Sequence, residues 1–335
     1  MELIAGDAGS LFTLAWRLSR NVILLPEPRS KATRGYSLAA GAALKPVKAS
    51  KPALADDAPS AMLSIVESCV AQWRANELGV AASDDIEYVH QMRVALRRLR
   101  AALRLCARLP ELPPSRALAM RLRSVARRLG ELRDLDVFFA DSVPALVVRL
   151  PAGLNCDTAF DTLEHRRRRK RKQMAPYLNA KAYAGCVLGM VTWCWRAANV
   201  APVGPSTRGF AVRMLARRHR SFWQLAQQID SLDAGGRHQL RIEGKKLRYA
   251  AEFFAAQFDH EKAAPYLATL EKLQEILGEQ NDNVNALSQI NTLPPHSGEC
   301  VAFASGFWAG KVENWQAPLA QCLAELAQQE KFWKR

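Results

Sequence analysis

Residues 90–104 and 238–252 are two copies of one amphipathic segment. His90 corresponds to His238 and Gly130 to Gly278, both at an offset of 148 residues, so the repeat extends well beyond the segment itself. A repeat of fixed period constrains architecture more strongly than local propensity, because each copy must fold as the same unit. A period of this length holds roughly four helices. We therefore expect an all-α fold of two pseudo-symmetric four-helix bundles.

Both copies align their cations when they are drawn as helices at about 100° per residue. The first copy places one narrow basic stripe beside an apolar stripe: His90, Arg93, Arg97, Arg100 and Arg104 beside Met92, Leu96, Leu99 and Leu103. The second copy does the same with His238, Arg241, Lys245 and Arg248 beside Leu240, Leu247 and Ala251, and departs at Glu252, which replaces Arg104. A basic face that borders a buried face points into a groove. An ordinary solvated basic face is the alternative, and the repetition of the stripe favours the groove.

The formal net charge of +15 makes polyanions the natural partners, whether nucleic acid, phosphate chains or an anionic membrane surface. The seven cysteines are odd in number and scattered, without a CxxC pair. This pattern argues for a reducing compartment and against disulfides or a structural zinc site. The longest apolar stretch, 182–195, is too short to span a bilayer, and no targeting segment is evident.

The chain divides into a distinct head and a helical body. Residues 1–45 contain a helix-like piece at 11–18 and strand candidates at 21–25 and 36–39, and residues 46–60 are typical of a linker. Beyond residue 60 no strands are expected. Helices are expected at about 61–77, 86–108, 115–130 (running on towards 142), 157–176, 181–198, 208–230, 236–256, 262–290 and 300–333, divided into four-helix units at 61–200 and 206–335.

Four motifs in order resemble the CHAD family, the conserved-histidine α-helical domain. They are HQxRVxxRRLR at 90–100, LGxxRDxDV at 129–137, HxxRIxxKKLRY at 238–249 and LGxxND at 277–282, within a domain spanning 61–335. The resemblance implies two four-helix bundles around a central basic cavity, and it implies binding of inorganic polyphosphate rather than catalysis. The matching positions are His90, Arg93, Arg97, Arg98, Arg100, His238, Arg241, Lys245, Lys246 and Arg248, and Arg104 extends the first stripe.

The head of the chain resembles the closing segment of a CYTH triphosphatase domain. The similar residues are Leu11-Phe-Thr-Leu-Ala and the stretch from Pro28 to Leu38. The ExExK signature of that family is absent, and 45 residues cannot close its barrel. We therefore interpret residues 1–45 as a remnant without triphosphatase activity.

Polyphosphate offers repeating anionic oxygens and no bases, so its site needs many cationic donors along a track. Arginine can take two oxygens with its planar fork, whereas lysine acts as a mobile point charge. An empty track of this kind repels itself, so bound ligand should raise the melting temperature.

His90 and His238 are expected either to donate hydrogen bonds to phosphate or to form structural hydrogen bonds with Asp134 and Asp282. We expect no catalytic residue, metal or cofactor. The acidic residues Glu131, Asp134, Asp136, Glu279 and Asp282 are expected to pair with arginines and fix helix ends.

Seven consecutive cations follow His165, and on a helix they point in all directions, so only two or three can join one face. They are interpreted as a mixture of polyanion capture and solvated surface, although such runs also resemble nucleic-acid patches. Further candidates for the basic lining are Arg121, Arg123, Arg127, Arg128, Arg169, Lys172, Arg213, Arg217 and Arg220.

The leading functional prediction is a cytoplasmic, non-enzymatic polyphosphate-binding protein associated with polyphosphate granules and with proteins of those granules. Nucleic acid is expected only as a non-specific competitor. The alternatives are an RNA- or DNA-binding protein, which the charge alone supports, a phosphohydrolase, and a scaffold for a protein partner. Competition with excess nucleic acid distinguishes polyphosphate binding from RNA or DNA binding, because nucleic acid should not displace polyphosphate from a dedicated site. Release of phosphate in the presence of magnesium would favour the phosphohydrolase.

Overall fold

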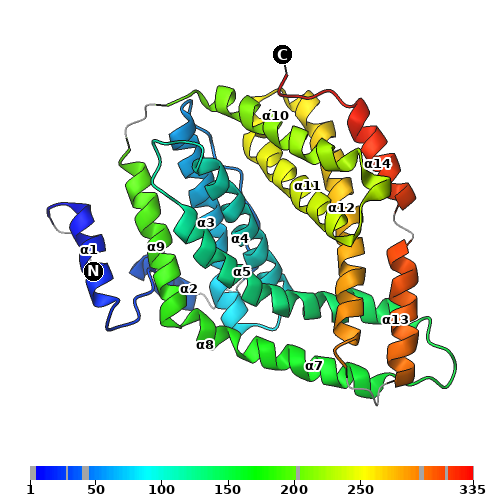
Figure 1. The fold of residues 1–335 in the computed structure, drawn as a ribbon. Coiled ribbons are helices and arrows are strands. Elements are labelled where there is room, and N and C mark those ends of the chain that lie inside the picture. The colour runs from blue at the N-terminus through cyan, green and yellow to red at the C-terminus, as the bar shows by residue number, and fades with distance from the viewer. Residues whose placement is uncertain are drawn as a thin grey trace. The chain divides into compact units, whose positions relative to one another are not determined.

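The computed structural model describes residues 5–27, 29–39, 45–200, 204–293, 298–313 and 316–334, and these residues form an all-α fold without strands (Figure 1). The chain forms two compact units. Unit 1 comprises Met1–Gly130 and Lys170–Gly204, and unit 2 comprises Glu131–Arg169 and Pro205–Arg335. Unlike the expected unit 61–200, unit 1 lacks residues 131–169, which belong with unit 2.

Unit 1 is built around the contact of α3 with α4 and α9 (Figure 1). Asp57 and Asp85 start α3 and α4 by accepting hydrogen bonds from the backbone N–H groups of Ser60 and Glu87, at 2.9 and 2.8 Å. Trp73 lies at the centre and is fully buried. The helices with residues in this unit are α1 (Ala8–Leu18), α2 (Lys31–Ala39), α3 (Ala58–Ala82), α4 (Ile86–Cys106), α5 (Arg116–Val137), α8 (Met174–Leu178), α9 (Lys181–Ala198) and the last residues of α7 (Asp157–Lys172).

Unit 2 is organised by the long helix α12 (His260–Ile290), which contacts α11 (Ala234–Phe254), α13 (Gly298–Glu313) and α14 (Gln316–Gln328). Its other elements are the π-helix η1 (Phe138–Ser142), α6 (Val143–Val147), α7 (Asp157–Lys172), α10 (Thr207–Ala226) and the single-turn 3₁₀ helices η2 (Ile229–Ser231) and η3 (Ala255–Gln257). Both α5 and α7 have residues in each unit.

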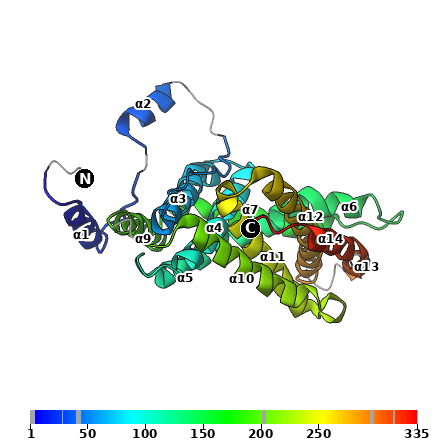
Figure 2. The ribbon, with the colours of Figure 1, turned by 90° about the horizontal axis from the view of Figure 1, so that it is seen from above.

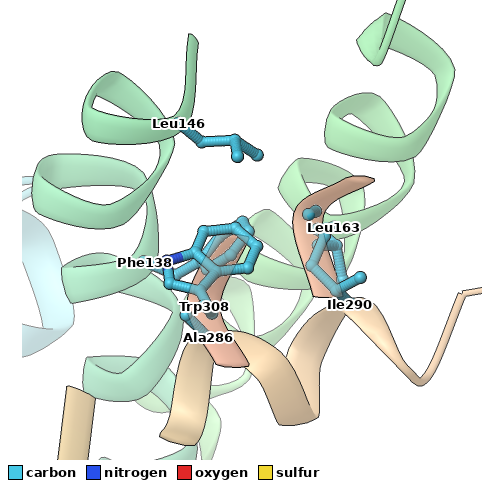
Figure 3. Close-up of a cluster of buried hydrophobic side chains, with 7 residues drawn as sticks. Phe138, Leu146, Leu163, Ala286, Ile290 and Trp308 are labelled. Carbon is cyan, nitrogen blue, oxygen red and sulfur yellow. The ribbon is translucent and has the colours of Figure 1, made fainter. Parts of the chain in front are cut away.

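A buried apolar cluster explains why 131–169 belongs to unit 2. Phe138 and Leu163 pack with Ile290 and Trp308, so η1 and α7 share one core with α12 and α13 (Figure 3). Full burial of one large apolar side chain stabilises the folded state by about 1.5–3 kcal/mol. The repeat in the sequence does not encode this contact, because it joins residues of the first copy to residues of the second.

Cys156 and Cys300 form a disulfide beside this cluster, with their Cα atoms 5.3 Å apart. The expectation that the cysteines form no disulfide is therefore wrong. The two cysteines lie 144 residues apart and outside any short motif, so only the packing of α7 against α13 brings them together. The other five cysteines are free thiols.

The helix expected at 11–18 is confirmed as α1, but neither strand candidate forms. Residues 21–25 have no regular structure, and 36–39 belong to α2. Helix α1 lies beside α9 in two orthogonal views (Figures 1 and 2). There the Trp16 indole donates a 3.2 Å hydrogen bond to Thr192 Oγ1, and the Phe12 ring lies 4.9 Å from that of Trp195.

The body of the chain follows the expected helices closely. The exceptions are 300–333, which is divided between α13 and α14, and 157–176, which is divided between α7 and α8. The expected linker 46–60 is held in place, because the buried Asn76 side chain donates to the Val47 carbonyl at 2.9 Å and accepts from its N–H at 3.0 Å. None of the described helices combines the length and the apolar composition that a membrane span requires.

Candidate anion-binding helices

Helix α4 carries the first copy of the repeat, and its predicted phase is confirmed. The four apolar residues that border the basic stripe are all buried within unit 1, namely Met92, Leu96, Leu99 and Leu103. The cations that border them are partly buried, namely His90, Arg93, Arg97, Arg98 and Arg100, whereas Arg104, in the last turn, is exposed. The stripe therefore lies at the margin of the core, where the Nε atoms of Arg93, Arg98 and Arg100 are buried.

Arg93 reaches across to α5. Its Nη1 lies 3.5 Å from the carbonyl oxygen of Ala126, and its guanidinium occupies the space beside Gly130, where a Cβ atom would overlap Nη1. Gly130 is the glycine of the LG motif, forty residues after His90. The structure thus gives a physical reason for pairing this glycine with the basic stripe: the glycine admits the arginine.

Arg100 lies in a group of cations. Burial, and then the charges of Arg104 and Arg123, hold the pKa of Arg100 below its ordinary value. Its Nε is buried and has no hydrogen-bond partner among the described residues. No carboxylate within the described part of the chain forms an ion pair with Arg100, Arg104 or Arg123. We call these three residues the Arg100 cluster.

Helix α11 carries the second copy and buries Leu240, Leu247 and Ala251 as its phase predicts. Asp233 starts it by accepting from the Gly236 N–H at 2.7 Å. Unlike the cations of the Arg100 cluster, Lys246 and Arg248 of α11 bind carboxylates among the described residues. Lys246 Nζ lies 2.6 Å from Glu243 Oε1. Arg248 binds two carboxylates.

Arg248 donates through Nε to Glu252 at 2.6 Å and through Nη2 to Glu271 at 3.3 Å. Burial lowers the pKa of Arg248, but the charge and hydrogen bond of Glu252, followed by the charge of Glu271, more than offset it, so the net pKa is raised. Arg248 occupies the repeat position of Arg100, and the net shifts of the two pKa values are opposite.

The repeat offset explains this difference residue by residue. Glu252 stands at the repeat position of Arg104, and Glu271 at that of Arg123. The two side chains that crowd Arg100 with positive charge are thus replaced by the two that neutralise Arg248. Of the two carboxylates, only Glu252 is predicted from the repeat within α11 itself. Applying the same offset to α5 and α12 would have found Glu271 as well.

The two motif histidines differ in exposure, since His90 is half-buried and His238 is exposed. His238 forms no hydrogen bond with any described residue, so the structural bond to Asp282 that was considered for it is absent there. Burial raises the pKa of Asp282, while a hydrogen bond from Asn281 and the charges of Arg241 and Lys245 oppose that rise. The expected pairing of motif acids with basic residues therefore holds for Asp282 as an electrostatic contact.

The basic run at 165–172 is largely engaged within the protein. Arg167 binds Glu164 at 2.7 Å and the buried Asp136 at 3.4 Å, and Arg168 binds Glu164 at 2.8 Å. Arg171 donates to the Ser83 carbonyl at 3.2 Å. Arg169 and Lys172 are exposed and contact no carboxylate among the described residues. They are the two members of the run that were expected to join the lining.

The remaining candidates for the lining are exposed on α5 and α10, and Arg128 stacks over the Tyr177 ring at 5.1 Å. They are Arg121, Arg123, Arg127, Arg128, Arg213, Arg217 and Arg220. Across the described ranges, no three His, Cys, Asp or Glu side chains are grouped so that they could hold a metal ion.

Comparison with known proteins decides the family. The sequence profile of the CHAD domain matches residues 64–290, which is more than half of the chain. The chain belongs to the CHAD family. A crystal structure of the CHAD domain from the plant Ricinus communis is similar, with 29% sequence identity and a TM-score of 0.77, covering 86% of this chain and 98% of that one.

PptA from Streptomyces chartreusis shares the fold at 14% identity and a TM-score of 0.59, covering 80% of this chain and 99% of that one. No curated protein matches the chain. The CHAD match begins after the head of the chain, so it does not bear on the resemblance of residues 1–45 to a CYTH domain.

Proposed function

We propose that this CHAD protein binds inorganic polyphosphate without chemically altering it. Membership of a family associated with polyphosphate binding supports the ligand class. The Arg100 cluster is the observation that carries the proposal. Three arginines that no described carboxylate neutralises, one of them partly buried, form a site in which a polyanion would relieve repulsion.

The chemistry of the ligand suits this site. A phosphate chain is a flexible row of anionic oxygens, and arginine forks can each take two of them. Because the stems of the basic residues on α4 are packed against the core, the charged ends are ordered before ligand arrives, which reduces the entropy lost on binding.

We extend the proposal to the architecture of the site. In it, the two repeat copies form four-helix bundles, and the basic stripes of α4 and α11 each contribute cations that bind phosphate. Binding of this kind would place the protein on polyphosphate granules in the cytoplasm, together with other granule proteins. The helical fold and the basic margin of α4 support this extension.

The decisive experiment measures binding of long-chain polyphosphate by the wild type and a site variant, at about 150 mM salt, where exposed charges are largely screened. The site variant is Arg93→Ala/Arg97→Ala/Arg241→Ala/Lys245→Ala. The control removes the same charge from exposed arginines outside the motifs: Arg20→Ala/Arg108→Ala/Arg149→Ala/Arg196→Ala. We expect the site variant to lose about 100-fold in affinity and the control less than about threefold.

Two further arms separate the alternatives. Excess RNA should leave polyphosphate bound, and displacement by RNA would identify a general polyanion binder. Incubation with magnesium should release no phosphate, and steady release would identify a phosphohydrolase. Equal losses in the site variant and the control would overturn the proposal.

A further inference from the structure

The two copies of the basic helix have opposite electrostatic surroundings. The Nε of Arg100 is buried without a hydrogen-bond partner among the described residues, and the nearby charges are those of Arg104 and Arg123. Arg248 instead donates hydrogen bonds to Glu252 and Glu271. Each of these residues has its counterpart at the repeat offset. Both copies are therefore helices with an arginine at the same repeat position, but the charge around that arginine differs.

We propose that the copies are functionally unequal: the Arg100 cluster in unit 1 binds phosphate groups directly, and Arg248 in unit 2 does not. This inference rests on the proposed function. It assigns Arg123 as a phosphate-binding residue and Glu252 and Glu271 as residues that exclude phosphate from Arg248.

The free energy of binding differs between the copies for a simple reason. At Arg248 a phosphate oxygen would have to displace a carboxylate 2.6 Å from Nε, and both carboxylates would repel the incoming anion. At Arg100 no carboxylate among the described residues has to be displaced, and an anion offsets the repulsion among three cations. Charge-assisted hydrogen bonds to phosphate are therefore gained in unit 1, whereas in unit 2 they would only be exchanged.

Lys246 follows the same pattern as Arg248. Its ammonium lies 2.6 Å from Glu243, which also accepts a hydrogen bond from Gln239 at 3.1 Å. The repeat position of Glu243 in the first copy is Ala95, which has no charge. The second copy thus carries three carboxylates at positions where the first carries an alanine and two arginines.

The test compares charge-neutralising substitutions at equivalent positions of the two copies, titrated with long-chain inorganic polyphosphate. Arg104→Gln/Arg123→Gln should weaken binding by about 30-fold, whereas Arg248→Gln should weaken it by less than about threefold. Glu252→Gln/Glu271→Gln frees Arg248 and should tighten binding by about tenfold. Controls with matched charge changes at exposed positions are Arg108→Gln/Arg149→Gln and Asp56→Asn/Asp161→Asn.

The outcomes distinguish the two proposals. If the wild type binds no polyphosphate, the proposed function fails, and this inference fails with it. If the wild type binds but Arg248→Gln weakens binding as much as Arg104→Gln/Arg123→Gln does, only the inequality of the copies is overturned. The inequality is also overturned if each double variant binds as its matched control does.

A second measurement needs no ligand. Because the Arg100 cluster repels itself, Arg123→Gln should raise the melting temperature of the free protein at low salt, and added salt should erase the gain. Glu271→Gln removes a partner of Arg248 and should lower the melting temperature instead. Shifts of the same sign in both variants would contradict the opposite surroundings on which the inference depends.

Discussion

The guanidinium of Arg93 fills the space that a side chain at Gly130 would need, so these two residues of separate motifs form one structural unit. Arg93 comes from α4 and Gly130 from α5. The repeat mate of Gly130 is different, because a Cβ atom built on Gly278 meets nothing within 4 Å. The same motif glycine therefore has a steric role in unit 1 that the structure does not give it in unit 2.

Gly130→Ala should displace Arg93 and weaken polyphosphate binding by about tenfold. The atom that must move is the end of a flexible side chain, so the fold should tolerate the change. Helix propensity should even raise the free energy of unfolding by up to about 1 kcal/mol. Titration with polyphosphate and denaturant unfolding measure the two effects separately.

Gly278→Ala provides the matched control, since it adds the same methyl group at the equivalent position into open space. It should leave binding unchanged. A double-mutant cycle sharpens the result: in an Arg93→Ala background, Gly130→Ala should have little further effect on affinity. Additive losses would contradict the steric link between the two residues.

The buried carboxyl group of Glu77 should make the free energy of unfolding depend on pH. Burial raises the pKa of Glu77 to about 7, against the charge of Arg74 and a hydrogen bond from Tyr183. The folded state therefore holds this proton more tightly than the unfolded chain does, so its contribution to stability is present at acidic pH. That contribution should be lost as pH rises from about 4.5 to beyond 7, by about 3 kcal/mol in total.

Glu77→Gln cannot ionise and should remove this part of the pH dependence. Urea unfolding at pH 5.5 and pH 8 measures it as the difference between the wild type and the variant, which cancels the other titrating groups. Glu67→Gln is a useful comparison, because burial also raises the pKa of Glu67, but its carboxylate forms no hydrogen bond with a described residue of another element. Parallel pH profiles for the wild type and Glu77→Gln would refute the assignment.

The disulfide between Cys156 and Cys300 should stabilise unit 2 by restricting the unfolded chain over 144 residues. Cys156→Ser/Cys300→Ser should lower the free energy of unfolding by about 2–4 kcal/mol. Dithiothreitol should destabilise the wild type by a similar amount and leave the double variant unaffected. Alkylation of both thiols in the unreduced protein would show that the bond does not form.

Asn76 is predicted to fix the segment before α3. Its buried side chain forms hydrogen bonds with both the N–H and the carbonyl of Val47. Asn76→Ala should therefore lower the free energy of unfolding by about 1–3 kcal/mol. It should also expose residues 45–57 to limited proteolysis. Ser50→Ala removes only an exposed bond to Ser68 and serves as the control. Equal rates of cleavage in the two variants would contradict the role of Asn76.

Much of this fold can be predicted from the sequence, because helical period and repeat are local or regular signals. The phase of α4 followed from residue spacing alone, and its four predicted apolar positions are buried. The starts of α4 and α11 are also local, because Asp85 and Asp233 each accept a hydrogen bond from a backbone N–H two or three residues further on. These features depend on neighbours within a few residues, which a single sequence displays directly.

The features that escaped prediction all depend on contacts between distant segments. The core shared by Phe138 and Trp308 joins the two halves of the repeat, and the disulfide follows from it. The strand expected at 36–39 is helical because local β-propensity is weak where no partner strand exists. For the site, the repeat offset identifies Glu271 as the counterpart of Arg123, but its contact with Arg248 depends on the packing of α12 against α11.

The packing of α1 against α9 and the disulfide at α13 have a consequence for truncating the chain to the residues that match the family profile. A protein cut to 64–290 would lose Phe12 and Trp16, leaving the Trp195 surface of α9 bare to water. It would also lose Trp308 and the thiol that crosslinks Cys156. The shortest segment that keeps its apolar surfaces covered is thus longer than the segment that matches the family profile.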